Sequence, residues 1–150
     1  MSRWRPSVTV AAVIERGGKF LLVEEEANGR RVLNQPAGHL DPGESLVQAV
    51  AREVLEETAH RFTPMALLGV YRWIYDQEAV TFLHFAFLGR VDGVEAGRKL
   101  DKEIIAAVWL TSAELAARRA EHRSPLVQQC VDDYLAGRSF PLDVLSKAYG

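Results

Sequence analysis

The most informative stretch of the chain is GHLDPGESLVQAVAREVLEET, residues 38–58. It opens with glycines and a proline, which are typical of a tight loop, and from Pro42 onward its apolar residues recur with the period of an α-helix. The apolar residues that share one side of this predicted helix are Leu46, Val47, Val50, Ala51, Val54, Leu55 and Thr58. We therefore predict a loop that runs directly into an amphipathic helix.

Three glutamates, Glu53, Glu56 and Glu57, lie on another face of the same helix. At these spacings neighbouring Cβ atoms are about 5–6 Å apart, so the carboxylates repel one another. They also lie near the C-terminal end of the helix, where the helix dipole disfavours negative charge. A solvated acidic face is one explanation. The other is a hard divalent cation, Mg²⁺ or Mn²⁺, bound by the carboxylate oxygens.

The loop before the helix offers further contacts for such a cation. Gly38 can turn sharply and present its backbone carbonyl to a metal, and Glu44 can accept hydrogen bonds that brace the loop. Arg52 precedes Glu56 by four residues, a spacing at which the two side chains pair. The loop and the three glutamates together favour a metal site over an ordinary acidic surface.

Strand signals and turn signals alternate over much of the remaining chain. The segments rich in β-branched and aromatic residues are 8–14, 20–23, 32–36, 66–75, 80–91 and 106–110. Gly17-Gly18 and Asn28-Gly29 predict hairpin turns, and residues 76–78 connect two of the strands.

Two shorter helices are predicted after the last strand. Thr111 and Glu114 have the spacing of a capping box, for a helix that ends near residue 119. Ser124-Pro125 predicts the start of a final helix, and Gly137 predicts its end. The whole order predicts an α/β (α+β) sandwich, in which a mixed sheet is flanked by helices without the regular alternation of a doubly wound fold.

Length, charge and composition limit the possible classes of protein. A chain of 150 residues fits one domain, residues 1–150. The formal charge of −2, without a long basic run, argues against nucleic acid and anionic membranes as partners. The sequence shows no signal peptide and no apolar run that could span a bilayer, and the single cysteine, Cys130, excludes an internal disulfide. We expect a cytoplasmic protein, either a monomer or a homodimer.

Residues 38–60 resemble the Nudix box. Its pattern is Gly, five residues, Glu, seven residues, Arg-Glu, an aliphatic residue, any residue, Glu-Glu, any residue, Gly and an aliphatic residue. The matching positions are Gly38, Glu44, Arg52, Glu53, Val54, Glu56 and Glu57. Ala59 replaces the closing glycine and His60 the aliphatic residue. If the closing glycine is a left-handed residue, alanine there costs about 1 kcal/mol.

Shorter motifs are similar to the phosphatase NudJ branch of that family, and the likeness extends over residues 7–142. They are NQPAGHL at 34–40, YRWI at 71–74, RSPLV at 123–127 and Pro141-Leu142. The branch implies a Nudix-type α/β/α sandwich that hydrolyses nucleoside tri- and diphosphates and the pyrophosphate of the thiamine pyrimidine precursor, releasing phosphate.

The resemblance also implies roles for individual residues. The metal ligands are expected to be the Gly38 carbonyl, Glu53, Glu56 and Glu57, with Arg52 as the arginine of the box. The resemblance does not fix the general base, because members of the family differ. One candidate is Glu53, and the other is Glu103, in the polar loop 101–103 before the last strand. A solvent-facing loop position is equally compatible with Glu103.

Other positions carry weaker indications. Trp73 and Tyr71 can stack on a base or a pyrimidine, although aromatic residues more often fill a sheet face, and Arg31 and Arg123 can hold phosphates. The glutamates at 24–26 are expected to be solvated at a hairpin end. His39 and His84 are expected in loop or core roles rather than as a metal pair, and Cys130 as packing.

Two other functions remain open from the sequence. One is a Nudix pyrophosphatase for ADP-ribose, a dinucleoside polyphosphate or an oxidised nucleotide. The other belongs to a different class, a Nudix module that senses a nucleotide without cleaving it. The complete set of box carboxylates favours catalysis.

Overall fold

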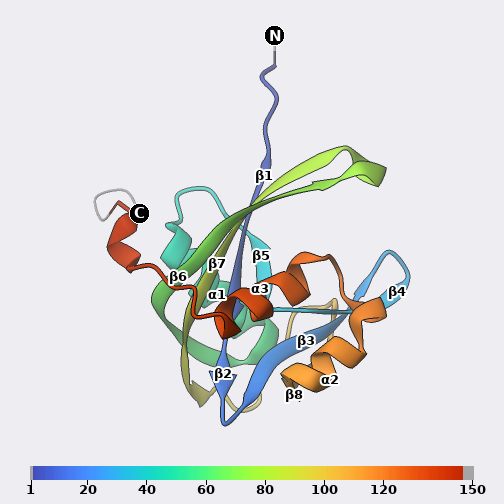
Figure 1. Ribbon diagram of the computed structural model, residues 1–150, viewed down its shortest axis with the longest axis vertical. Helices are drawn as coiled ribbons and strands as arrows, with labels where there is room; N and C mark the ends of the chain where they lie inside the picture. Colours follow the sequence, from blue (N-terminus) through green and yellow to red (C-terminus); the bar gives the residue numbers. More distant parts are fainter. Residues whose placement is uncertain (1, 147–150) are drawn as a thin grey trace.

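The computed structural model describes residues 2–146 and builds them around two β-sheets (Figure 1). The first sheet is mixed and has the strand order β5-β1-β7-β6. Its strands are β1 (Ser7–Val13), β5 (Ala37–His39), β6 (His60–Tyr75) and β7 (Val80–Val94). β1 runs parallel to β7, whereas β5 and β6 are antiparallel to their neighbours. The expected mixed sheet is therefore present.

The second sheet is antiparallel and was not expected as a separate unit. Its strands are β2 (Glu15–Arg16), β3 (Lys19–Ala27), β4 (Arg30–Asn34) and β8 (Ile104–Thr111). β3 pairs with the other three. Asn28 and Gly29 both have positive φ, 52° and 74°, in the turn between β3 and β4. Two successive positive φ angles are what a tight hairpin turn requires, so the predicted turn is confirmed.

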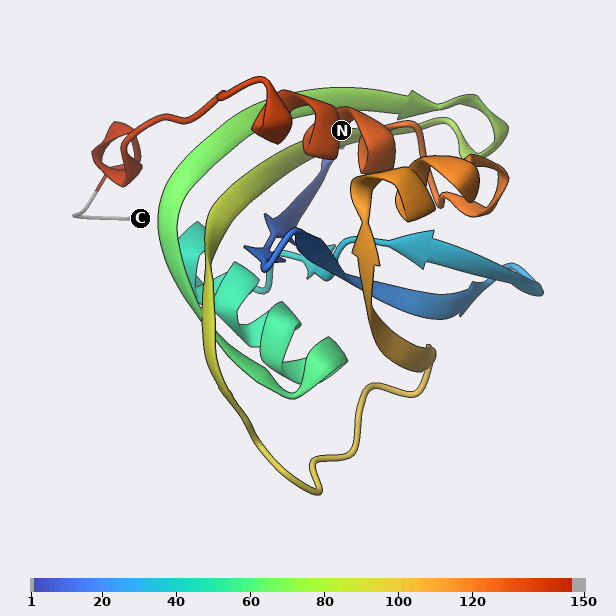
Figure 2. The same cartoon turned by 60° about the horizontal axis from the view of Figure 1, so that its bottom comes forward.

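Helix α1 (Leu46–Thr58) lies inside the curve of β6 and β7 (Figure 2). Ser45 caps its first turn, and Gln48 completes a capping box. Val50 and Val54 are fully buried in the core that α1 shares with the mixed sheet. The predicted loop-to-helix transition is confirmed, and this packing holds the glutamates of α1 in fixed positions.

Helices α2 (Ser112–Ala117) and α3 (Leu126–Leu135) follow β8. Thr111 and Glu114 form the predicted capping box. Val127, Cys130 and Val131 of α3 are fully buried in a second core, together with residues of both sheets. Short 3₁₀ turns occur at Asp76–Glu78, Arg119–Glu121 and Leu142–Val144. The structure is thus a mixed α+β fold in which α1 packs against the mixed sheet and α3 packs against residues of both sheets.

The structure departs from the predicted boundaries mainly in β6, which begins at His60 rather than at residue 66. Register shifts interrupt its pairing with β7 between His60 and Phe62, Pro64 and Ala66, and Leu67 and Gly69. Each shift breaks the two-residue alternation by which a strand is recognised from sequence. A long bent strand such as β6 is therefore predicted from its sequence to be shorter than it is.

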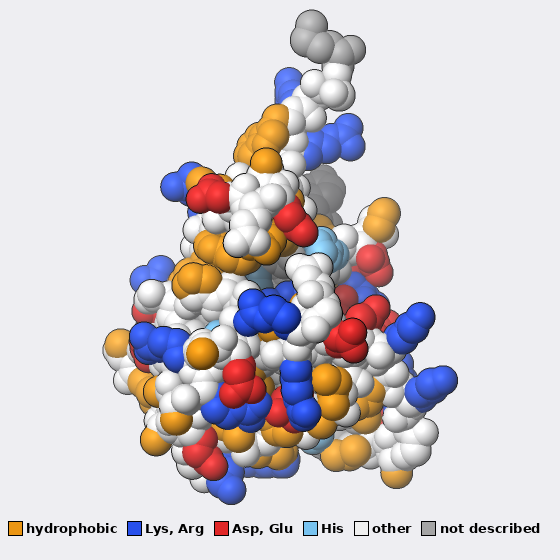
Figure 3. Space-filling view, turned by 90° about the vertical axis from the view of Figure 1, so that its right-hand side faces the viewer, with side chains coloured by type: hydrophobic (Ala, Val, Ile, Leu, Met, Phe, Trp, Pro, Cys, Tyr) orange, Lys and Arg blue, Asp and Glu red, His pale blue; other side chains and the backbone are white. Residues whose placement is uncertain are grey.

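No helix within residues 2–146 is long and apolar enough to cross a membrane. On the face shown in Figure 3, acidic and basic side chains are interspersed rather than separated into patches.

Candidate active site

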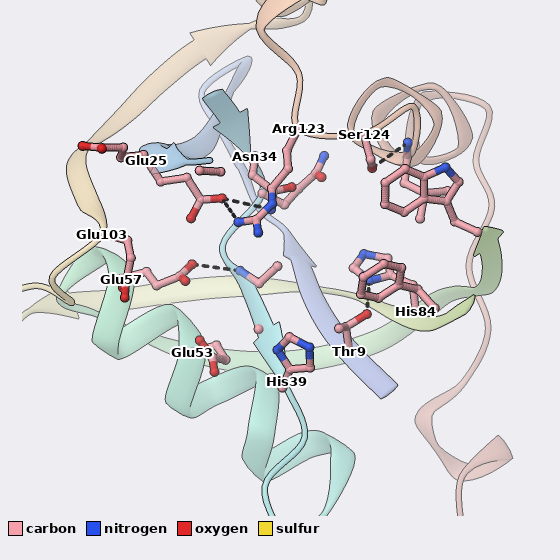
Figure 4. Close-up of a pocket in the computed structure, with 18 of the residues that line it drawn as sticks. Thr9, Glu25, Asn34, His39, Glu53, Glu57, His84, Glu103, Arg123 and Ser124 are labelled. Atoms are coloured by element: carbon pink, nitrogen blue, oxygen red, sulfur yellow. Dashed lines mark hydrogen bonds and ion pairs between the residues drawn. The ribbon is translucent and has the colours of Figure 1, made fainter. Parts of the chain in front are cut away.

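A cavity of about 480 Å³ opens between the two sheets and α1. Figure 4 shows the side chains around it. α1 and β5 contribute Glu53, Glu57 and Gly38, the β3–β4 hairpin contributes Glu25, and the segment before α3 contributes Arg123. Elements that are distant in the sequence therefore meet at one site.

Glu57 is almost completely buried, with 7% of its surface exposed. Its Oε1 accepts a hydrogen bond from the Ala37 backbone N–H at 2.9 Å, which ties α1 to β5. Burial raises the pKa of Glu57 to about 9, and the neighbouring carboxylates Glu25, Glu53 and Asp101 act in the same direction. Without a cation nearby, this carboxyl group holds its proton at neutral pH.

Glu53 is also buried and lies directly against Gly38. A Cβ atom at position 38 would come within 2.1 Å of the Glu53 Cδ atom. Burial raises the pKa of Glu53 to about 7, while the guanidinium of Arg52 acts in the opposite direction. Only glycine at position 38 leaves room for this carboxylate.

Arg52 connects the helix to the preceding loop. Its guanidinium lies 2.6 Å from Glu44, 2.8 Å from Glu53 and 2.9 Å from Glu56. It also donates to the backbone carbonyl of His39 at 3.0 Å. These contacts raise the pKa of Arg52 and lower that of Glu44. The predicted pairing of Arg52 with Glu56 is confirmed.

The loop brace expected of Glu44 is confirmed as well. Its Oε1 accepts a hydrogen bond from the Asp41 backbone N–H at 3.1 Å.

Asp101, in the loop before β8, completes an acidic cluster with two of the helix glutamates. One carboxylate oxygen from each of Glu53, Glu56 and Asp101 lies within 4.8 Å of the others. The Asp101 backbone N–H donates to the Glu56 carbonyl at 3.0 Å, which holds the loop against α1. Burial and the charge of Glu56 raise the pKa of Asp101. Sequence reasoning missed Asp101, because no spacing rule links position 101 to the helix.

The donor set fits a hard divalent cation. Glu53 and Glu57 are buried carboxylates with raised pKa values, and Glu56 and Asp101 add further oxygens beside Glu53. Cations of the Mg²⁺ class prefer such oxygen ligands. The missing Cβ of Gly38 provides the space that the Glu53 carboxylate occupies.

Arg123 and Glu25 form an ion pair at the cavity wall, with 2.7 Å between Nη1 and Oε1. Glu24 and Glu25 are both buried, and Glu24 pairs with Arg118 at 2.7 Å and with Arg31 at 2.9 Å. The expectation of a solvated glutamate cluster is therefore wrong for both. Residues 20–25 of β3 are all buried, so both faces of the strand are covered and burial does not alternate along it.

The other predicted site residues are divided between the cavity and the surface. Glu103 and Trp73 line the cavity, with Trp73 stacked on Phe82 at a centroid distance of 5.4 Å. Tyr71 does not line the cavity. Its side chain instead reaches α3, where the hydroxyl donates a hydrogen bond to Asp133 at 2.6 Å. Arg31 does not line the cavity either.

His39 and His84 line the cavity, whereas Cys130 does not. His39 lies at the cavity as the last residue of β5 rather than in a loop, and His84 Nδ1 is 2.7 Å from the Thr9 hydroxyl. Cys130 is fully buried, and burial raises the pKa of its thiol to about 12, as expected of packing.

Comparisons with known proteins agree with this geometry. A family model described as the NUDIX domain matches residues 3–130. Phosphatase NudJ of Escherichia coli strain K12 is 38% identical over 142 residues, which cover 95% of this chain and 92% of that protein. NudJ of Shigella boydii serotype 4 gives the same identity and coverage. A solved NUDIX hydrolase from Nitrosomonas europaea is 52% identical, with a TM-score of 0.94, over 97% of this chain and 99% of that one.

Proposed function

The chain belongs to the Nudix family of hydrolases, and from that premise we propose that it is a Mg²⁺-dependent phosphatase of small phosphoanhydrides. Its substrates are nucleoside tri- and diphosphates and the pyrophosphate of the thiamine pyrimidine precursor, from which it releases inorganic phosphate. The similarity to phosphatase NudJ supports the branch. The observation that carries the proposal is the acidic cluster of Glu53, Glu56 and Asp101. Glu53 of this cluster and Glu57 are buried carboxylates that line the cavity.

In this proposal Glu53, Glu56, Glu57 and the Gly38 carbonyl hold the cation, and Asp101 joins them. Mn²⁺ can take the place of Mg²⁺. When bound, the cation neutralises charge on the phosphate oxygens and acidifies a water molecule. Arg52 positions Glu53 and Glu56 through its contacts at 2.8 Å and 2.9 Å.

Glu103 is the general base in this proposal. Its side chain is exposed and lines the cavity, whereas Glu53 is buried and held by Arg52. A base must reach the attacking water, and an exposed side chain at the rim can do so. The water oxygen bonds to the terminal phosphorus, Glu103 takes the proton, and the bridging P–O bond breaks to release phosphate.

The substrate lies between Arg123 and Trp73. Among the described residues that line the cavity, Arg123 is the single arginine or lysine, so it is the candidate to hold a phosphate oxygen. Trp73 provides an aromatic surface for a base or a pyrimidine. Tyr71 and Arg31 have no part in this proposal, because neither lines the cavity.

A product assay by phosphorus NMR tests the proposal. The panel contains nucleoside tri- and diphosphates, the thiamine pyrimidine pyrophosphate and ADP-ribose, each with and without Mg²⁺. We expect release of inorganic phosphate from the first three, and only with the metal. Cleavage of ADP-ribose alone would contradict the NudJ-like specificity and retain Nudix chemistry. Nucleotide binding without any turnover would support a sensing module instead.

A further inference from the structure

The cavity has a second end, opposite the carboxylates, which is formed by the mixed sheet. Thr9 and His84 lie across the cavity from Glu57 and Glu103 in Figure 4. The sheet register explains this grouping, because Thr9 of β1 is the partner of His84 in β7, and Phe82 of β7 is the partner of Trp73 in β6. All four residues line the cavity.

His84 has one ring nitrogen occupied and one available. Its Nδ1 lies 2.7 Å from the Thr9 hydroxyl. Within residues 2–146, no protein group makes a hydrogen bond to Nε2. Burial lowers the pKa of His84 to about 4, so the ring is neutral at physiological pH. A neutral imidazole of this kind suits an uncharged ligand edge better than a phosphate.

The contact with Thr9 lets Nε2 act in either hydrogen-bonding role. If the Thr9 hydroxyl donates to Nδ1, Nε2 carries the proton and is a donor. If Nδ1 donates to the hydroxyl, Nε2 is an acceptor. A polar group that can adapt in this way, beside the stacked rings of Trp73 and Phe82, matches a flat ring with both donors and acceptors on its edge.

From this geometry we infer that Thr9 and His84 form a subsite that recognises the heteroaromatic ring of the substrate. Trp73 and Phe82 provide the apolar surface, and His84 Nε2 hydrogen-bonds the ring edge. The inference rests on the proposed function for the position of the phosphates, and it assigns specificity to residues outside the metal site.

Binding of non-hydrolysable analogues tests the subsite separately from catalysis. The probes are the α,β-methylene diphosphates of uridine and adenosine, and methylenediphosphonate as the ring-free reference, each titrated calorimetrically with Mg²⁺ present. His84→Phe keeps a ring and removes both nitrogens, and Thr9→Val keeps the shape and removes the hydroxyl. Ile74→Ala is the matched control, since Ile74 is exposed next to Trp73 and does not line the cavity.

We expect His84→Phe to weaken binding of a nucleoside analogue about two- to tenfold, the equivalent of one hydrogen bond. Binding of methylenediphosphonate should stay the same, and Ile74→Ala should change neither affinity. The inference would be overturned if His84→Phe lost equal affinity for both kinds of probe, or if it lost affinity for neither of the two nucleoside analogues. Because the analogues are not hydrolysed, this outcome is independent of whether the protein releases phosphate.

A second measurement uses the unmodified protein, in case His84→Phe does not fold. The imidazole nitrogen resonances of His84 report whether Nε2 gains a hydrogen bond. We expect the Nε2 resonance to shift on addition of a nucleoside analogue and to remain in place with methylenediphosphonate. Identical spectra with both probes would contradict the inference.

Discussion

The carboxylate of Glu53 occupies the space that a side chain at Gly38 would need, with 2.1 Å between Glu53 Cδ and the position of the missing Cβ. Gly38→Ala must therefore displace Glu53, and we expect it to weaken Mg²⁺ affinity and turnover by about 10- to 100-fold, as loss of a positioning contact does in metal sites. A Mg²⁺ titration of phosphate release measures this.

The matched control for that variant is Gly17→Ala. Gly17 has a positive φ of 60° with nothing within 4 Å, so alanine there strains only the hairpin. It should lower thermal stability and leave the Mg²⁺ dependence unchanged. If both variants lose activity alike, the effect of Gly38→Ala comes from folding rather than from Glu53.

The buried carboxyl of Glu57 makes the metal-free protein sensitive to alkaline pH. Its pKa is about 9 in the folded protein against an ordinary value of 4.5, so the folded state binds more protons than the unfolded state between these two pH values. Stability is then lost as pH rises. In chelator, between pH 7 and 8.5, we expect the free energy of unfolding to fall by about 1–2 kcal/mol more in wild type than in Glu57→Gln.

Chemical denaturation at several pH values measures that difference. Below pH 6.5 the lowered pKa values of His84 and His122 make the free energy of unfolding rise with pH, which is opposite to the effect of Glu57. The comparison is therefore restricted to pH 7 and above. Parallel curves for the two proteins would show that Glu57 is already ionised without metal.

Ala59 closes α1 in a left-handed conformation, with φ 60° and ψ 15°. This is the position at which the Nudix box has glycine. Ala59→Gly removes the strain of a Cβ in that conformation, so we expect stabilisation by up to about 1 kcal/mol, or roughly 2–4 °C in Tm. Ala136→Gly is the control, because Ala136 ends α3 with an ordinary φ of −77° and should lose stability. A lower Tm for Ala59→Gly would rule out strain at this position.

Arg123→Gln tests phosphate binding at the cavity wall. The pairing of Arg123 with buried Glu25 places its guanidinium at the cavity, and a charged hydrogen bond to phosphate is worth about 1.5–3 kcal/mol. We expect KM to rise about tenfold or more, with a smaller effect on kcat. Arg119→Gln is the matched control, an exposed arginine that does not line this cavity. If steady-state kinetics show equal effects on KM for both variants, Arg123 does not bind the phosphate.

Local sequence rules predicted those parts of the molecule whose conformation depends on neighbours along the chain. The capping box at Thr111 and the turn at Asn28-Gly29 are examples, because each depends on residues within a few positions. The pairing of Arg52 with Glu56 follows from helical spacing in the same way. These features need no knowledge of the tertiary fold.

Features formed across distant segments could not be found in this way. Asp101 reaches Glu53 only because β8 returns beside α1, and buried Glu25 of β3 pairs with Arg123 from the segment before α3. Thr9 and His84 meet through the parallel pairing of β1 with β7. Periodicity describes one segment at a time, so it gives no information on which segments become neighbours.

In the proposed function, the glutamates of α1 and a divalent cation together drive phosphate release. The most direct measurement is the rate of phosphate release from a nucleoside diphosphate, first in chelator and then after adding excess Mg²⁺, for wild type and Glu57→Gln. We predict no release in chelator and release by wild type once Mg²⁺ is added. With Mg²⁺, the rate of Glu57→Gln should be lower than that of wild type by at least about 100-fold. Release by wild type in chelator, or an undiminished rate for Glu57→Gln, would contradict the claim.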